Sequence, residues 1–252
     1  MNIYTGRNSQ IGQYLPNTLN YVSYNIKDET TWGFLHECNN LFLIVPKIPH
    51  VLEHCKNFIY TAKQAGVKKI VKIGSLGSWR VIHNQLDTYI RDCGINCISF
   101  DMSVLMNNIF TEQYIETTLL NYRHDTPAPY LDPKALAEAI EQAMNREALL
   151  NFNIKATGRF QYSIEEVKDI LELNGYPVTS IETTHNNQLH KNAGVSPDQR
   201  LMSNISDDYA LGIYPLISTD LNMFGVTSRS LEDFVEQDSV YFLNLQDGDK
   251  NL

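Results

Sequence analysis

The sequence predicts an α/β protein with a doubly wound parallel sheet over residues 1–150, a smaller lobe over 151–240 and a loose tail over 241–252. Strand and helix patterns alternate through the first half, which is typical of parallel strands joined by right-handed crossovers. A glycine-containing turn follows the first strand. The pattern of residues changes near Asp125, where three prolines precede or begin a new helix pattern. The smaller lobe is expected to take in Met106–Asn121 as well.

The alternation is visible in the individual segments. The run Leu41–Pro46 is apolar and ends at a breaker, as expected of a strand buried on both faces. From Val51 to Ala62 apolar residues recur every three or four positions and Gly66 follows, which predicts an amphipathic helix. In order, we expect strands over 1–4, 41–46, 67–75 and 95–103, and helices over 50–66 and 83–94.

Capping residues mark the helices of the second half. Asp132 is the predicted N-cap of a helix that begins at Pro133. Ser163 followed by Glu166 is a capping-box pattern, and Ser230 is the predicted cap of a last short helix. Strand patterns precede and follow the helix that Ser163 begins.

Composition limits the classes of function. The net charge is −9 and no basic block stands out, which disfavours binding to nucleic acid. No apolar run approaches the roughly 20 residues of a membrane-spanning helix. The chain opens on a strand, so we expect no signal peptide, and four cysteines in 252 residues indicate a reduced, cytoplasmic protein. The expected partner is a small-molecule substrate, and the composition is compatible with a homodimer.

The segment "TGRNSQIG" after the first strand has part of the pattern of a dinucleotide-binding turn. Gly6 and Gly12 fit the glycines that make the tight turn and pack the following helix. Ser9 takes the place of the glycine that lets a pyrophosphate approach the backbone. Arg7 offers a guanidinium that could pair with phosphate.

The order of segments resembles the NmrA-like branch of the atypical short-chain dehydrogenases. "NFIYTAKQAGVKKIVKIGSLGS", "HNQLDTYIRDCGINCISFDMS" and "YLDPKALAEAIEQAM" carry the resemblance, which covers nearly the whole chain. It implies a Rossmann-like sheet, a small C-terminal substrate lobe, and NADP or NAD as cofactor. The implied cofactor-binding residues are Gly6, Arg7, Ser9, Gly12, Asp28, Val45, Pro46 and Met102.

The chain departs from the family on the adenosine side. Asp28 follows Gly12 by only 16 positions, so a helix and a strand of the family are missing here. The remaining segment "LNYVSYNIKD" is then expected to pair beside the first strand. Asn25, Lys27 and Asp28 are the side chains left to reach an adenosine ribose.

The catalytic positions depart as well. The family's Tyr-x3-Lys pair is replaced by His83 and Asp87, which are near-matches to the His and Glu of NmrA-like relatives. One helical turn separates them, so Asp87 could orient the imidazole, whose pKa would suit proton transfer near neutrality. Ser75 ends a strand, and Asp101 replaces the arginine of the family's Arg-Pro-Gly. Each also has an ordinary structural interpretation, as a cap, a surface group or a paired core carboxylate.

His50 and His54 are four residues apart, a spacing that can place two imidazoles on one helix face. No third ligand accompanies them at a convincing spacing, so we predict no metal site.

Two functions remain open at this stage. The first is reduction of a small carbonyl or unsaturated substrate with NAD(P)H. The second is a degenerate relative that binds no nicotinamide and works as a cofactor-independent cyclase or isomerase, or as a ligand-sensing regulator. In either case we expect the ligand between Gly6, Val45, Ser75 and Met102, at the carboxyl ends of the strands.

Overall fold

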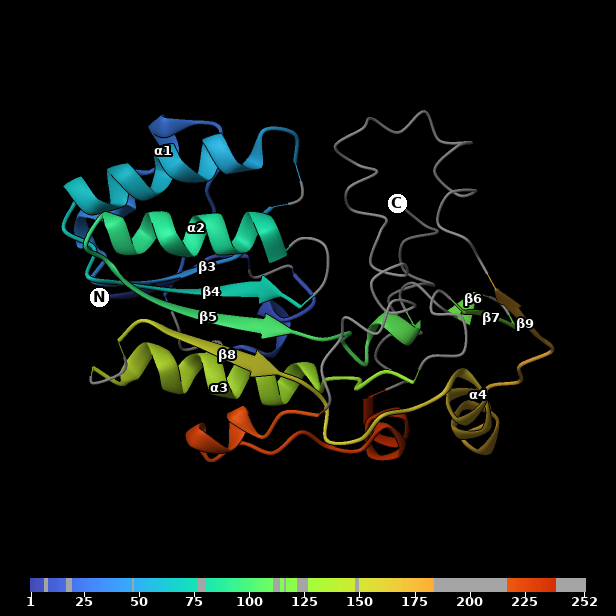
Figure 1. Cartoon of the computed structure of the whole chain (residues 1–252). Helices are drawn as coiled ribbons and strands as arrows, with labels where there is room; N and C mark the ends of the chain where they lie inside the picture. The colour runs from blue at the N-terminus through green and yellow to red at the C-terminus, as the bar shows by residue number, and fades with distance from the viewer. Residues whose placement is uncertain are drawn as a thin grey trace.

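The computed structural model describes residues 1–6, 9–16, 20–46, 48–76, 80–110, 114–115, 117–121, 127–147, 150–183 and 217–238. The predicted tail over 241–252 lies outside these residues, as does Arg7. A layered α/β domain contains the main sheet, and a smaller sheet with its own helices lies beyond the carboxyl ends of its strands (Figure 1).

The main sheet has six parallel strands in the order β2-β1-β3-β4-β5-β8. Their bounds are Asn2–Tyr4 for β1, Asn20–Tyr21 for β2, Asn40–Leu43 for β3, Lys69–Ser75 for β4, Asn96–Met102 for β5 and Phe152–Ala156 for β8. The prediction of a parallel α/β sheet is confirmed. The short strand β2 pairs with β1, as the shortened crossover required.

Helices cover both faces of this sheet (Figure 1). On one face lie α1 (Val51–Gln64) and α2 (Arg80–Asp92), and on the other lies α3 (Pro133–Asn145). Each face has its own apolar core: alternate residues of the strands pack toward α1 and α2 or toward α3. Helix α2 begins three residues before the predicted start at His83.

The boundary predicted at residue 150 needs a correction, because β8 belongs to the main sheet. It pairs in parallel with β5, from Ile98 opposite Phe152 to Met102 opposite Ala156. The smaller lobe therefore receives the chain after β8 and not at residue 151. A strand pattern alone does not name its pairing partner, so the sequence placed this strand in the wrong unit.

The lobe contains a sheet in the order β6-β7-β9, with bounds Tyr114–Ile115, Thr118–Asn121 and Ser180–Thr183. Helix α4 (Ile164–Leu173) and the helix over 231–238 pack on a third apolar cluster, which includes Met106, Ile109 and Leu119. The segment predicted to join the lobe thus supplies part of its core.

The predicted helix caps are confirmed. An Asp132 carboxylate oxygen accepts a hydrogen bond from the Lys134 backbone N–H at the start of α3. Ser163 and Glu166 form a complete capping box on α4. Ser230 Oγ accepts from the Asp233 N–H, 3.1 Å away. These local signals hold because each involves residues within one turn of the chain.

The four cysteines are free thiols. Within the described ranges, no helix is both long and apolar enough to cross a membrane. Nor do the described His, Cys, Asp and Glu side chains form a group of three or more that could hold a metal ion.

Candidate functional site

The carboxyl ends of β1, β3, β4 and β5 meet at one edge of the sheet, because these strands are parallel neighbours. The arrowheads of β4, β5 and β8 point toward the smaller lobe (Figure 1). Ser75 and Met102, the last residues of β4 and β5, are direct partners across the sheet. Open parallel sheets bind their ligands at this edge.

The turn after β1 keeps its shape around Gly6. This residue has a φ of 73°, and a Cβ there would lie 2.5 Å from Ile44 Cδ1. Both facts favour glycine, one through backbone conformation and one through space. Ser9 Oγ accepts a hydrogen bond of 2.9 Å from the Gly12 N–H. Gly12 then begins η1, a 3-10 helix of only three residues, Gly12–Tyr14.

Asp28 is engaged in local structure. It is the N-cap of η2 (Glu29–Thr31), and its Oδ1 accepts from the Thr30 backbone N–H at 3.1 Å and from the Thr30 hydroxyl at 2.6 Å. Next to this turn, the Tyr24 ring stacks on the Phe58 ring with 5.0 Å between the ring centroids. Trp32 meets the same ring edge-on, with 5.1 Å between the centroids. The shortened crossover is therefore packed on α1 as part of the core.

The described residues do not fit a dinucleotide in the usual site of this fold. That site needs the N-terminus of a long helix after β1, whose free N–H groups and dipole hold the pyrophosphate. Among the described residues between β1 and β2, the only helical turn is the 3-10 turn η1, and the Ser9 hydroxyl accepts a hydrogen bond from the Gly12 N–H. The carboxylate that could hold the ribose, Asp28, caps its own turn.

Of the other residues predicted to bind a cofactor, Val45 is buried in the core beneath α1, while Pro46 and Met102 are half-buried at the strand ends.

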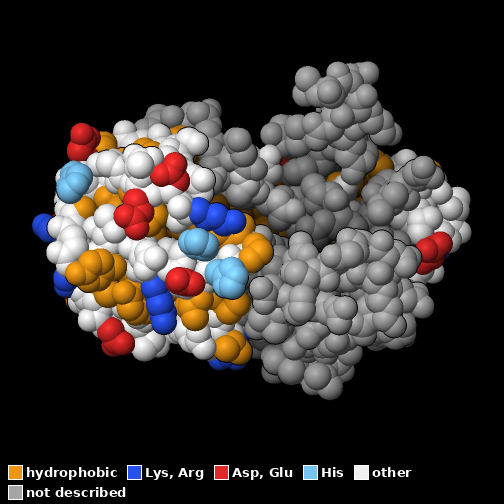
Figure 2. Space-filling model, turned by 90° about the horizontal axis from the view of Figure 1, so that it is seen from above, with side chains coloured by type: hydrophobic (Ala, Val, Ile, Leu, Met, Phe, Trp, Pro, Cys, Tyr) orange, Lys and Arg blue, Asp and Glu red, His pale blue; other side chains and the backbone are white. Residues whose placement is uncertain are grey.

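The described part of the outer face over α1 shows basic, acidic and histidine side chains intermixed (Figure 2).

Beneath α2, a buried polar cluster surrounds Lys72 in the middle of β4. Its side chain is fully buried. Its Nζ lies 2.8 Å from Asp87 Oδ1, 3.0 Å from Ser99 Oγ and 3.4 Å from His83 Nδ1. Two of these partners come from α2 and one from β5. We call Lys72, His83, Asp87, Ser99 and Asp101 the Lys72 cluster.

His83 lies in the first turn of α2 and is 7% exposed. Burial and the positive charge of Lys72 lower the pKa of His83 to about 3. The expectation that this imidazole titrates near neutrality is therefore wrong. His83 is a neutral ring at ordinary pH.

Asp87 is 1% exposed and pairs with Lys72, so it is a structural counter-ion. Its second carboxylate oxygen accepts from Asn153 Nδ2 at 3.3 Å. From the sequence, Asp87 could orient His83 or be an ordinary surface carboxylate, and its burial excludes the second interpretation. Both side chains instead contact Lys72, which lies between them in this network.

Asp101 lies one residue before the end of β5 and is 6% exposed. Its cross-strand partner is Gly74, where a Cβ would overlap Asp101 Oδ1 and lie 2.8 Å from Ser99 Oγ. Glycine therefore makes the room that this carboxyl occupies. Ser99 Oγ donates to Asp101 Oδ1 across 3.2 Å. Burial is the largest cause that raises the pKa of Asp101, against the opposing charges of Lys72 and Arg80.

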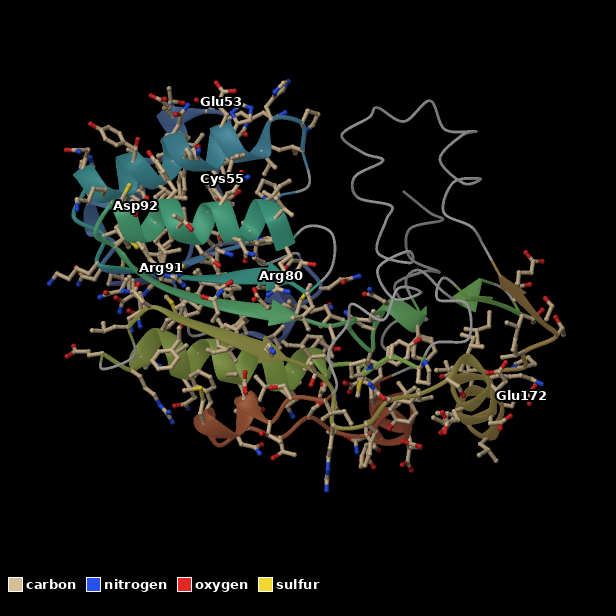
Figure 3. The ribbon with its side chains drawn as sticks, viewed as in Figure 1. Glu53, Cys55, Arg80, Arg91, Asp92 and Glu172 are labelled. Carbon is tan, nitrogen blue, oxygen red and sulfur yellow. The ribbon has the colours of Figure 1, made fainter. Side chains whose placement is uncertain are left out.

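Arg80 is the first residue of α2 and lies at the helix end nearest the carboxyl ends of β4 and β5 (Figure 3). Arg91 and Asp92 lie at the opposite end of the same helix (Figure 3). The site thus has an exposed cation beside a nearly buried carboxyl.

Sequence reasoning missed Lys72 and Ser99. A signal was present, since Lys72 interrupts an apolar strand pattern at a position whose neighbours in the strand are buried. A buried lysine needs a counter-charge, and Asp87 supplies it. Which acid pairs with Lys72 depends on how α2 is placed over β4. The residue pattern of the strand holds no information on that placement.

The comparisons with known proteins concern structure. No family model matches the sequence, and no curated protein matches it. Solved structures match over nearly their whole lengths. The triphenylmethane reductase of Citrobacter sp., complexed with NADP(H), is 15% identical with a TM-score of 0.73, over 94% of this chain and 99% of that one.

Two further structures are equally similar. A nucleoside-diphosphate-sugar epimerase of Staphylococcus aureus is 14% identical with a TM-score of 0.76, over 94% of this chain and 99% of that one. The NADPH-dependent quinone oxidoreductase of Escherichia coli, complexed with NADPH, is 16% identical with a TM-score of 0.75, over 93% of this chain and 98% of that one. At these identities the likeness shows the fold, and it confirms the Rossmann-like α/β class.

Proposed function

We propose that this chain is a small-molecule enzyme that transfers protons without a nicotinamide cofactor, as an isomerase or cyclase does, with Asp101 as its acid–base group. The observation that carries the proposal is the nearly buried Asp101 carboxyl at the carboxyl end of a central strand, in the space that Gly74 leaves. A group so placed in this fold is at the edge where ligands bind.

The chemistry follows from the environment of the carboxyl. Burial raises the pKa of Asp101, so its carboxylate is a stronger base than an exposed aspartate. It can take a proton from one atom of a bound carbonyl compound and return it to another. Atoms and electrons then balance within the substrate, and no oxidant or reductant is needed. Arg80 at the start of α2 favours a substrate that carries negative charge.

The misfit of the opening turn supports the absence of a nicotinamide step. Among the described residues of the turn, the three-residue η1 offers only a short helix, and the Gly12 N–H donates to Ser9 Oγ instead of to a phosphate. Losing one charge-assisted hydrogen bond costs about 1.5 to 3 kcal/mol, roughly ten- to a hundredfold in affinity.

A second candidate is reduction of a small carbonyl or unsaturated substrate with NAD(P)H. Two of the three similar structures described above are complexed with NADP(H) or NADPH, and this is the observation in its favour. The shared fold supports the broad class only, because one fold hosts many chemistries.

Proton exchange separates the two candidates. A panel of small ketones, aldehydes and enones is incubated with the protein in D2O, without nucleotide, and deuterium uptake at carbon is followed by NMR. We expect exchange for at least one compound, and a loss of roughly a hundredfold or more in Asp101→Asn. Asp92→Asn, an exposed carboxylate at the far end of α2, is the matched control and should exchange normally.

Calorimetric titration with NADPH and NADH completes the test. We expect no binding heat up to millimolar nucleotide. Micromolar binding together with substrate-dependent oxidation of the nucleotide would establish the second candidate instead. A compound that binds without any exchange would make the protein a ligand sensor and overturn the enzyme proposal.

A further inference from the structure

We propose that Lys72 is a positioning residue of the candidate site: it fixes His83 as the imidazole tautomer that carries its hydrogen on Nε2, and it orients the Asp101 carboxyl through Ser99. The inference rests on the proposed function for its chemical meaning. The hydrogen-bond directions that carry it follow from the contacts of Lys72 alone.

A lysine ammonium has three N–H donors and no acceptor. Lys72 has three contacts, to Asp87 Oδ1 at 2.8 Å, Ser99 Oγ at 3.0 Å and His83 Nδ1 at 3.4 Å. Lys72 must therefore donate in every one of them. Its donors match its partners one for one, with the shortest contact going to the counter-ion.

The contact with His83 sets the tautomer of the ring. Nδ1 accepts from Lys72, so it carries a lone pair and no hydrogen. In a neutral imidazole the single hydrogen is then on Nε2. The charge of Lys72 and the burial of the ring both disfavour a second proton, and the pKa of His83 is lowered to about 3.

The contact with Ser99 sets the direction of a second hydrogen bond, the one between Ser99 and Asp101. The hydroxyl oxygen accepts from Lys72, so the hydroxyl hydrogen is available for Asp101 Oδ1, 3.2 Å away. One oxygen of the Asp101 carboxyl is thereby held by an O–H donor from within the sheet. The other, Oδ2, is the oxygen left to exchange a proton with a ligand.

These directions define the chemical class of the ligand. A substrate that reaches His83 Nε2 is met by a hydrogen-bond donor and must present a lone pair, as a carbonyl or enolate oxygen does. A neutral donor in the same cluster as a carboxyl base suits removal of a proton next to that carbonyl, because the donor stabilises the charge that develops on oxygen.

The tautomer can be read directly in the unmodified protein. Nitrogen-15 NMR of the imidazoles distinguishes a ring nitrogen that carries hydrogen from one that does not, and His83→Gln identifies the signal. We expect His83 to show a hydrogen on Nε2, none on Nδ1, and no change between about pH 5 and about pH 8. A hydrogen on Nδ1, or a ring that becomes cationic in this range, would overturn the proposal.

Substitution of Lys72 tests the cause. Lys72→Met leaves Asp87 unpaired and could fail to fold, so the double variant Lys72→Met/Asp87→Leu removes both charges together. In either folded variant we expect the His83 signals to become a mixture of tautomers. We also expect the pKa of His83 to rise, because a neighbouring positive charge is lost.

Lys69→Met is the matched control. Lys69 is also buried and on β4, but its Nζ donates to the carbonyl oxygens of Ala143 and Arg146 at the end of α3. The His83 signals should be unchanged in this variant. If Lys72→Met/Asp87→Leu folds and keeps the wild-type tautomer, Lys72 does not set it.

The two proposals can fail separately. The NMR measurement needs no substrate, so the tautomer can be confirmed in a protein that exchanges no proton at carbon. Conversely, Asp101-dependent exchange that is unaffected in Lys72→Met/Asp87→Leu would keep the proposed function and overturn the positioning role.

Discussion

The Nζ atom of Lys72 lies 2.8 Å from Oδ1 of Asp87, and both side chains are almost completely buried between β4 and α2. Such a pair is expensive to break from one side, because the remaining charge keeps its desolvation cost and loses its partner. Its removal as a whole is less costly, since apolar groups of similar volume can fill the space.

Lys72→Met should therefore lower the free energy of unfolding by about 3 to 5 kcal/mol. Lys72→Met/Asp87→Leu should recover most of that loss. Urea unfolding of the wild type, both single variants and the double variant gives the coupling between the two residues as a double-mutant cycle. Single substitutions whose losses simply add would mean that the pair is not coupled.

Gly74 should not tolerate a side chain. The Cβ of Gly74→Ala would overlap Asp101 Oδ1 and crowd Ser99 Oγ, so we expect a loss of about 1 to 3 kcal/mol in unfolding free energy. In Gly33→Ala the new methyl meets nothing within 4 Å, and unfolding should change by less than about 0.5 kcal/mol. Equal losses in the two variants would mean that the contact with Asp101 does not set the cost at Gly74.

Arg229 should hold the C-terminal segment on α3. Its guanidinium is 2.8 Å from Asp132 Oδ2 through Nε and 3.0 Å from Oδ1 through NH2, a two-pronged contact with the carboxylate that caps α3. Asp132 is 2% exposed, so Arg229→Met leaves a buried carboxylate without its cation and should cost about 3 kcal/mol.

The control for Arg229→Met is Lys168→Met, which removes the exposed pair with Glu172 at 3.7 Å and should cost less than about 0.5 kcal/mol. Thermal unfolding compares the two. Similar melting temperatures for both variants would contradict a structural role for the Arg229 contact.

The fold was predictable to the extent that its signals are local. Strand and helix periodicity, the caps at Asp132 and Ser163, and the pairing of β2 with β1 all follow from short stretches of sequence and from chain length. The membership of β8 in the main sheet was not predictable in this way. Its partner β5 lies far away in the sequence, and an isolated strand pattern is the same in either sheet.

The candidate site was only partly predictable for the same reason. His83, Asp87 and Asp101 were identified by position, yet the charge that determines their states comes from Lys72 on another element. An imidazole pKa depends on what packs against the ring in three dimensions. From sequence alone, His83 was therefore expected to titrate near neutrality, whereas in the structure its pKa is strongly lowered.

His83 should also give the protein a measurable acid sensitivity. The pKa of His83 is about 3 in the folded protein, below its ordinary value of 6.5, so the unfolded chain binds more protons between these two values. The contribution of the neutral His83 ring to the free energy of unfolding is complete above about pH 6.5, and it is lost as the pH falls below that value. At about pH 5 the loss from this group is about 2 kcal/mol.

Urea unfolding at about pH 7.5 and about pH 5 measures this loss. In His83→Gln the amide oxygen can still accept from Lys72 but cannot gain a proton, so the difference between the two pH values should shrink by about 2 kcal/mol. The Asp101 carboxyl, whose raised pKa acts in the opposite direction, is present in both proteins and cancels. His36→Gln, at an exposed position of η3 (Gly33–Glu37), should behave like the wild type. A pH dependence that His83→Gln leaves intact would show that other groups, and not this imidazole, make the fold sensitive to acid.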